Sequence, residues 1–224
     1  MTTTLLRSSI GSQKHTPLLL LAMVSVAYWL VGTSLADIDW ALLALTWAMV
    51  ISGCIALVAI RPQRAGLSPP HVMLTLGFGG MVVGLSWDVM QKTVPLLEDL
   101  CAATDGLPFG AALQAHLIFL PGMHAGMIAG GLAAIPGLRI LRPDCGRYLC
   151  AVFAQNLMCS AWMLIGMTAG ALWLSRIATG GSYGLTEMLG GMFAGMTWGM
   201  VISVALYRGY FVLKDRRAGA TGRA

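Results

Sequence analysis

The stretch Gly122-Met123-His124-Ala125-Gly126-Met127 decides the fold class, because it combines glycines four residues apart with methionine in an otherwise apolar run. Three further apolar runs carry the same Gly-Met-x-x-Gly signature, beginning at Gly80, Gly166 and Gly191. Within lipid, glycine at this spacing gives a helix a flat groove that another helix can approach closely, and methionine adds a flexible thioether. The signature therefore predicts a membrane bundle packed through Gly-x-x-x-Gly ridges. The glycines expected in these ridges are Gly80, Gly84, Gly122, Gly126, Gly166, Gly170, Gly191, Gly195 and Gly199.

Composition indicates an integral membrane protein. Of the 224 residues, 57% are hydrophobic and only 10% are charged, which lies far outside the range of soluble globular proteins. A helix needs about 20 apolar residues to cross a bilayer. Six runs approach or exceed this length, so the prediction is one all-α transmembrane domain over residues 1–224 with no soluble domain. The predicted spans are 17–35, 40–60, 72–89, 111–135, 148–174 and 185–207.

The basic residues orient the predicted bundle, because Lys and Arg are retained on the cytoplasmic side of a membrane. Of the 14 Lys and Arg residues, all but Lys92 and Arg176 fall in the N-terminal tail and in every second connection after it. The sequence therefore predicts an N-in/C-in protein of the bacterial inner membrane. Cys145 is expected inside, and Cys101 outside, where a membrane-impermeant thiol reagent would label it. The net charge of +5 is then attributed to the anionic inner leaflet rather than to nucleic acid.

The longest connection, residues 90–110, lies on the predicted outer side. It contains the amphipathic segment 96–100 and ends at a Gly-x-Pro turn. These features are typical of a short interfacial helix. We expect this helix to cap the outer mouth of the bundle.

Polar and sulfur-bearing side chains inside the spans are candidates for function, because polar groups are costly in hydrocarbon. At about 100° per residue, Met81 and Asp88 share one face of the third span, and His116, Met123 and Met127 share one face of the fourth. In the sixth span, methionines recur at every fourth residue from 188 to 200. The predicted spans place Asp88 and His116 near the outer interface and the methionines deeper in the membrane. The prediction is therefore an entrance with hard ligands above an interior with soft ligands. The candidate metal ligands are Asp88, His116, Met123, His124, Met127, Met163, Met167, Met192 and Met196.

Thioether and imidazole together are a ligand set that selects Cu(I), and carboxylate with imidazole could receive a harder ion at the entrance. Two Met-x-x-x-Met pairs, Met123 with Met127 and Met192 with Met196, lie beside Gly-x-x-x-Gly packing. These few residues resemble in chemistry those of the eukaryotic high-affinity copper transporters, which have half as many spans and work as trimers. Copper is accordingly the ion that the ligand set predicts, and transport or handling of a soft metal is the predicted function.

Two other functions fit the same residues. Methionine is an adaptable core filler, so the chain could be a non-catalytic subunit of a larger membrane complex, or a homo-oligomer, whose glycine ridges are contact surfaces. A membrane metalloenzyme would instead hold a catalytic metal with Asp88, His116 and His124. The sequence contains no nucleotide-binding loop, no metalloprotease motif and no nucleophile elbow, so it does not support a kinase or a hydrolase.

Two local features complete the predictions. Pro121 is expected to kink the fourth span and to free a backbone carbonyl, which makes residues 121–127 the most site-like stretch of the chain. Glu187 precedes the glycine ridge of the sixth span. A carboxylate there is expected at the start of a helix, where it complements the helix dipole.

Overall fold

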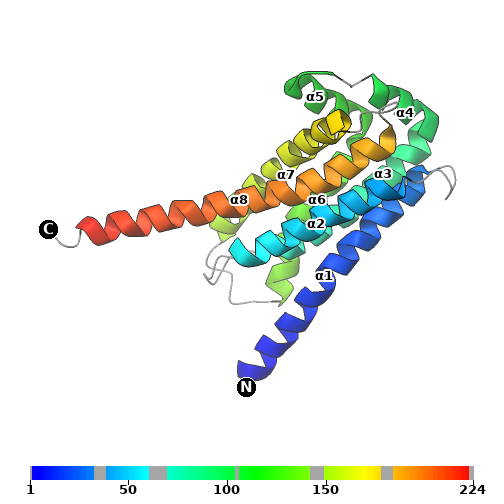
Figure 1. Ribbon diagram of the computed structural model, residues 1–224. Helices are drawn as coiled ribbons and strands as arrows, with labels where there is room; N and C mark the ends of the chain where they lie inside the picture. Colours follow the sequence, from blue (N-terminus) through cyan, green and yellow to red (C-terminus); the bar gives the residue numbers. More distant parts are fainter. Residues whose placement is uncertain are drawn as a thin grey trace.

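The structure is a computed structural model that describes residues 2–32, 39–60, 70–103, 106–141, 149–177 and 184–221. Within these ranges, side chains are described for 16–134, 156–210 and 212–213. The described ranges contain helices and no strand (Figure 1). The helices are α1 (Thr2–Val31), α2 (Trp40–Ile60), α3 (Pro70–Lys92), α4 (Val94–Ala102), α5 (Phe109–Phe119), α6 (Pro121–Leu141), α7 (Leu149–Ile177) and α8 (Leu185–Thr221).

Four helices in the described ranges are long and apolar enough to cross a membrane, namely α2, α3, the Asn156–Ile177 part of α7 and the Leu185–Tyr210 part of α8. The bent pair α5 and α6 becomes a fifth span if the two helices count as one. The described apolar part of α1, Thr16–Val31, is shorter. The described part of the chain is therefore all-helical, with four to five apolar helices able to span a membrane, and is compatible with a multi-pass membrane protein. Residues 33–35 of the first predicted span, and Cys145, lie outside the described residues.

The predicted span 111–135 is wrong as a single helix. It is divided at Leu120, where α5 and α6 meet at 93°. Proline at the first position of α6 lacks a backbone N–H and restricts the residue before it, and Leu120 has φ −124° and ψ 56°, outside the helical region. Pro121 thus breaks the span that it was expected to kink. His116 lies on α5 and Met123 on α6, so the prediction that they share one helical face is also wrong.

Two antiparallel helix pairs, α3 with α6 and α7 with α8, form the body of the bundle. In both pairs glycines of one helix face the backbone of the other so closely that a Cβ would collide with a carbonyl oxygen. A backbone carbonyl cannot turn away as a side chain can, so a larger residue would have to separate the helices. The facing glycines are Gly80 with Gly126, Gly84 with Gly122, Gly166 with Gly195, and Gly170 with Gly191, while Gly199 faces the carbonyl of Trp162.

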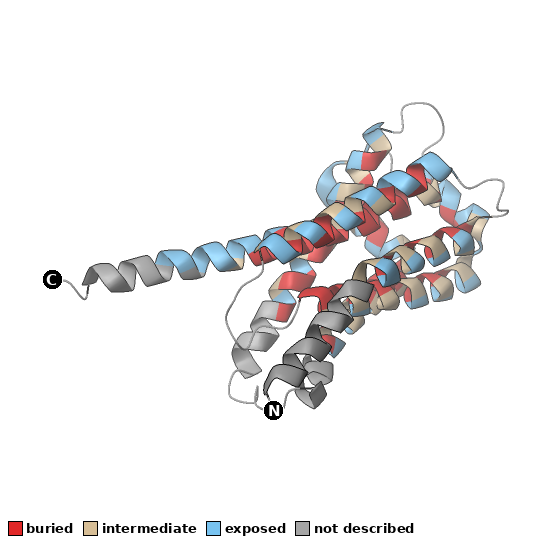
Figure 2. Ribbon diagram, turned by 60° about the horizontal axis from the view of Figure 1, so that its bottom comes forward, coloured by how far each residue is buried: buried red, intermediate tan, exposed pale blue. Residues whose placement is uncertain are grey.

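Methionine side chains fill the space between the two pairs. A Cβ added to Gly77 of α3 would lie 2.5 Å from Cε of Met196 on α8, and one added to Gly131 of α6 would lie 3.6 Å from Cε of Met163 on α7. The buried core follows this interface, and residues 205–210 of α8 are mostly exposed (Figure 2). The methionines buried among the described residues are Met73, Met81, Met123, Met127, Met163, Met167, Met188, Met192, Met196 and Met200.

The connection 90–110 contains α4, a nine-residue helix that packs against α3 and α8. Cys101, near its end, is only 2% exposed. Burial, with a smaller contribution from the charge of Glu98, raises the pKa of the Cys101 thiol to about 12. A buried, protonated thiol reacts slowly with alkylating reagents. Cys101 is therefore a poor target for the thiol reagent suggested by the sequence, and the side of the membrane on which it lies stays a prediction.

Candidate functional site

The break between α5 and α6 lies beside the end of α3, where Asp88 closes one side of it. Oδ1 of Asp88 accepts a hydrogen bond of 2.9 Å from the backbone N–H of Gly122, and Oδ2 accepts one of 2.7 Å from that of Met123. The first N–H groups of a helix have no partner within it, and a negative charge there is favourable. Asp88, named above as a metal ligand, has both oxygens engaged in capping α6.

Lys92 closes the other side of the break. Its Nζ donates hydrogen bonds of 3.1 Å and 2.7 Å to the carbonyls of Ile118 and Phe119, in the last turn of α5. A cation is favourable at a helix C-terminus. Asp88 and Lys92 are one turn apart on α3, so one helix end caps both halves of the broken span. We refer to this pair as the Asp88–Lys92 clamp.

Sequence reasoning missed the role of Lys92 as a cap of α5, because in the sequence Lys92 is visible only as one of two exceptions to the predicted cytoplasmic placement of Lys and Arg. The available signal was the Asp-x-x-x-Lys spacing at the end of an apolar run, followed by a run with a central proline. The Glu187 prediction is confirmed. Its Oε2 accepts a 3.1 Å hydrogen bond from the N–H of Gly184 at the start of α8.

His124 of α6 presents a free ring nitrogen to the protein interior. Its Nδ1 lies 2.7 Å from the carbonyl oxygen of Leu120. Because a carbonyl can only accept, Nδ1 carries the proton and Nε2 keeps its lone pair. Nε2 is buried and has no hydrogen-bond partner within the described part of the chain. A histidine that ligates a metal commonly donates its other ring N–H to a backbone carbonyl in this way.

His116 reaches the same region from α5, which packs against α7. Its side chain is 1% exposed, and its Nδ1 has no hydrogen-bond partner among the described side chains and backbone. His116 and His124 lie on opposite sides of the break at Leu120. An unsatisfied buried polar group costs about 1–3 kcal/mol. A ligand that supplied a partner to the unpaired ring nitrogens of His116 and His124 would therefore stabilise the protein.

A second set of unsatisfied groups lies on α7. The side-chain nitrogen and oxygen of Asn156, and Oγ of Ser160 one turn later, are buried with no hydrogen-bond partner in the described ranges. Ser160 lies at the α6 interface, because a Cβ added to Gly131 would be 3.1 Å from its Oγ. Unsatisfied polar groups are thus present both near the break, in His116 and His124, and on α7, in Asn156 and Ser160.

The structure brings the remaining candidates, the six methionines, into one buried hydrophobic cluster. All six are 0% exposed. Within the described residues, no group of three or more His, Cys, Asp or Glu side chains could hold a metal ion. A metal bound here would depend mainly on thioethers, and thioethers prefer soft ions. The six are Met123, Met127, Met163, Met167, Met192 and Met196.

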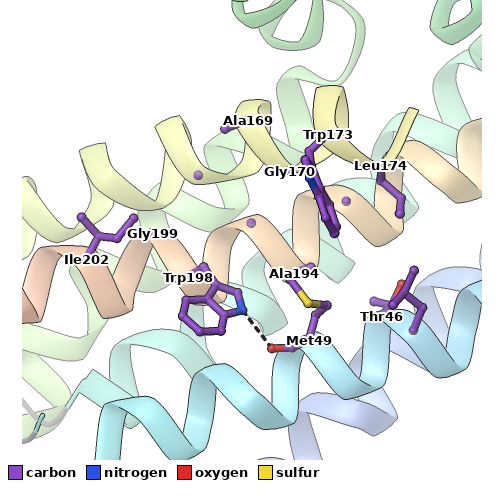
Figure 3. A pocket seen from close by; sticks show the side chains of 14 residues that line it. Thr46, Met49, Ala169, Gly170, Trp173, Leu174, Ala194, Trp198, Gly199 and Ile202 are labelled. Atoms are coloured by element: carbon purple, nitrogen blue, oxygen red, sulfur yellow. Dashed lines mark hydrogen bonds between the residues drawn. The ribbon is translucent and has the colours of Figure 1, made fainter. Parts of the chain in front are cut away.

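A separate apolar groove of about 330 Å³ lies between α2, α7 and α8. Glycines of α7 and α8 line it together with Trp173, Trp198 and Met49 (Figure 3). Nε1 of Trp198 donates a 3.2 Å hydrogen bond to the carbonyl of Met49, and Oγ1 of Thr46 donates one of 3.0 Å to Leu42. These two polar groups are therefore already satisfied, and the groove suits an apolar occupant. The sequence analysis did not predict it.

Comparison with protein-family models, with curated proteins and with solved structures finds no match. The described residues beside the broken helix include two buried imidazoles and several buried thioethers, which are donors of the type that soft cations prefer.

Proposed function

We propose that this chain is a multi-pass protein of the bacterial inner membrane that binds and passes a soft metal ion, Cu(I) above all. The path would follow the interface between the two glycine-packed helix pairs. The observation that carries the proposal is Nε2 of His124, a buried lone pair without a partner among the described residues, in a bundle whose core is filled by methionine. Its tautomer is the one that a metal ligand needs.

The broken span supports the proposal. Discontinuous helices in transporters commonly form the substrate site, because their ends supply polar groups within the membrane. His116 lies just before the break and His124 just after it, on helices that meet at 93°. The Asp88–Lys92 clamp satisfies the helix ends themselves. The imidazoles are then the polar groups near the break that remain available to a cargo ion.

The proposal includes the six-span, N-in/C-in arrangement, with α1 as the first span and the pair α5 and α6 as one broken span. Exposed tryptophans support it. Trp29, Trp87 and Trp173 lie toward the ends of α1, α3 and α7, Trp40 begins α2, and all four are 48–64% exposed. In an alternating bundle these positions fall on the outer side, as in an interfacial aromatic belt.

Cysteine substitutions at exposed positions test this topology. In intact cells, a membrane-impermeant thiol reagent should label Gln91→Cys, at the end of α3, above the background of the unsubstituted protein. It should label Leu213→Cys, on α8, only after the membrane is permeabilised. Both positions are exposed. Labelling of Leu213→Cys but not Gln91→Cys in intact cells would invert the topology.

The functional test replaces Met123, Met163 and Met192 together with leucine. Leucine keeps the volume and apolarity of methionine but removes the thioether donor, at a packing cost below about 1.5 kcal/mol per site. The expected result is a folded protein that retains less Cu(I) on purification than the parent does and no longer changes copper uptake or tolerance in cells. Metal content, copper-dependent growth and protein abundance are measured together.

The matched control replaces Met23, Met49 and Met90, which lie at intermediate or exposed positions, with leucine. This control should retain metal and behave as the parent does. A second variant, His116→Ala with His124→Ala, should lose metal as the core triple variant does. If the core triple variant handles copper normally at normal abundance, the methionines serve packing and the metal proposal is refuted.

The second candidate function is a non-catalytic subunit of a larger membrane complex. The apolar groove between α2, α7 and α8 favours it, because a glycine-lined groove with satisfied polar groups suits contact with another apolar surface in lipid. Purification in mild detergent separates the two candidates. A stable partner that co-purifies with metal-free protein would favour the subunit, whereas metal-loaded protein without a partner would favour metal handling. No observation favours the metalloenzyme alternative.

A further inference from the structure

A sulfur pair lies at the end of the bundle formed by α4 and the start of α8. The thiol of Cys101, on α4, donates a hydrogen bond of 3.4 Å to Sδ of Met188, in the first turn of α8. The two residues are 87 positions apart in the chain and are 2% and 1% exposed. The fold therefore brings a thiol and a thioether, both soft donors, into direct contact.

The pair is continuous with the methionines of α8. Met188, Met192, Met196 and Met200 recur at every fourth residue, which is a step of about 6 Å along a helix axis. All four are buried. Together the four methionines form a row of thioethers along α8, and the thiol of Cys101 contacts the first of them, Met188. We refer to this row as the α8 methionine row.

The surroundings of the pair favour a cation. Glu98 and Asp99 are exposed carboxylates on the same short helix, and the charge of Glu98 acts electrostatically on Cys101. A negative charge beside a thiol favours a positive ion in the same place. The two carboxylates are exposed, and the two sulfurs are buried. An ion arriving from the outer side would thus meet oxygen donors first and sulfur donors next.

We infer that Cys101 and Met188 form a metal site for a soft monovalent cation, Cu(I) or Ag(I), at the outer end of the α8 methionine row. This inference rests on the proposed function and adds the site where the ion would enter. With bonds of about 2.3 Å, as for zinc–thiolate, an ion between sulfurs 3.4 Å apart would form an S–metal–S angle of about 95°, so a more open two-coordinate geometry requires the two side chains to move apart. On binding, the S–H bond of Cys101 breaks, its proton passes to water, and the thiolate and the Met188 lone pair bind the ion. No electron is transferred.

The test uses the full chain purified in detergent and Cu(I) added as its acetonitrile complex under argon. Retained copper per chain and the ultraviolet thiolate-to-copper charge-transfer absorption are measured for the parent, Cys101→Ala and Met188→Leu. Cys101→Ala should lose one Cu(I) per chain together with the absorption. Met188→Leu, a near-isostere, should weaken retention of the same ion. Cys54→Ala is the matched control, because Cys54 is also buried but lies on α2, and it should change neither quantity.

The triple variant of Met123, Met163 and Met192 separates this site from the core. If the inference holds, that variant loses core copper but keeps the ion and the absorption of the sulfur pair. If the parent binds Cu(I) and Cys101→Ala retains the same number of ions and the same absorption, the entry site is refuted and the proposed function stands. If the folded parent binds no Cu(I), both are refuted. Thermal unfolding of each variant shows that the comparison is made between folded proteins.

Discussion

Replacing Gly195 with leucine is expected to separate α7 from α8 and to lower the free energy of unfolding by more than about 3 kcal/mol, the upper part of the range for overpacking. A Cβ at this position would collide with the carbonyl oxygen of Gly166, a backbone atom that cannot rotate away. Leucine adds three further carbon atoms to the same place. Thermal unfolding in detergent, followed by circular dichroism, should show a large decrease in the melting temperature or no folded protein at all.

The matched control is Gly209→Leu, on the same helix. A Cβ at Gly209 would meet nothing within 4 Å, and leucine has the higher helix propensity by about 0.8 kcal/mol. This variant should therefore melt at or above the temperature of the parent. If Gly195→Leu melts as the control does, the glycines of α8 do not pack against α7 in the membrane protein, and the arrangement of the two pairs is wrong.

Replacing Asp88 with alanine should open the break between α5 and α6. Two N–H groups, that of Gly122, which is half-buried, and that of Met123, which is buried, would lose a charged acceptor. A hydrogen bond to a charged group contributes about 1.5–3 kcal/mol, so a loss of about 3 kcal/mol or more is expected. Unfolding in detergent measures this loss, and Asp88→Asn, which keeps one oxygen acceptor, should lie between alanine and the parent.

The exposed carboxylate Asp99 provides the control, since Asp99→Ala should change stability by less than about 0.5 kcal/mol. The same Asp88 variants also separate capping from metal binding. If the carboxylate serves only as a cap, Asp88→Asn keeps the copper content of the parent. A stable Asp88→Ala protein that has lost metal would show that the carboxylate is a ligand after all.

The sequence was sufficient for the features that depend on local composition. Apolar runs predicted the helices, and α2 coincides with the predicted span 40–60. The position of the break was also available, because proline at 121 acts through its own ring and the residue before it. The size of the bend was not, since it depends on what holds the two helix ends apart. Those contacts, from Asp88 and Lys92, join residues 26–35 positions apart.

For the candidate site, too, the sequence predicted what depends on local composition and missed what depends on contacts between distant residues. The residue types named from the sequence identified the buried sulfur and imidazole donors, because polar groups and methionines inside apolar runs are visible without a structure. Their roles were not visible. Asp88 and His124 both looked like ligands, yet Asp88 has its acceptors occupied, and His124 keeps a lone pair because Leu120 fixes its tautomer. Whether any of these residues binds a metal remains a prediction.

The glycine contacts also have a mechanical consequence. Where backbone meets backbone, no side chain can change its rotamer, so each helix pair behaves as a stiff unit. Between the two units lie methionines, whose side chains each have three rotatable bonds and adapt to irregular gaps. Stiffness is thus concentrated within the pairs, and compliance is concentrated between them. Any relative movement in this protein would be a sliding of one pair past the other across a deformable sulfur layer, with the glycine contacts unchanged.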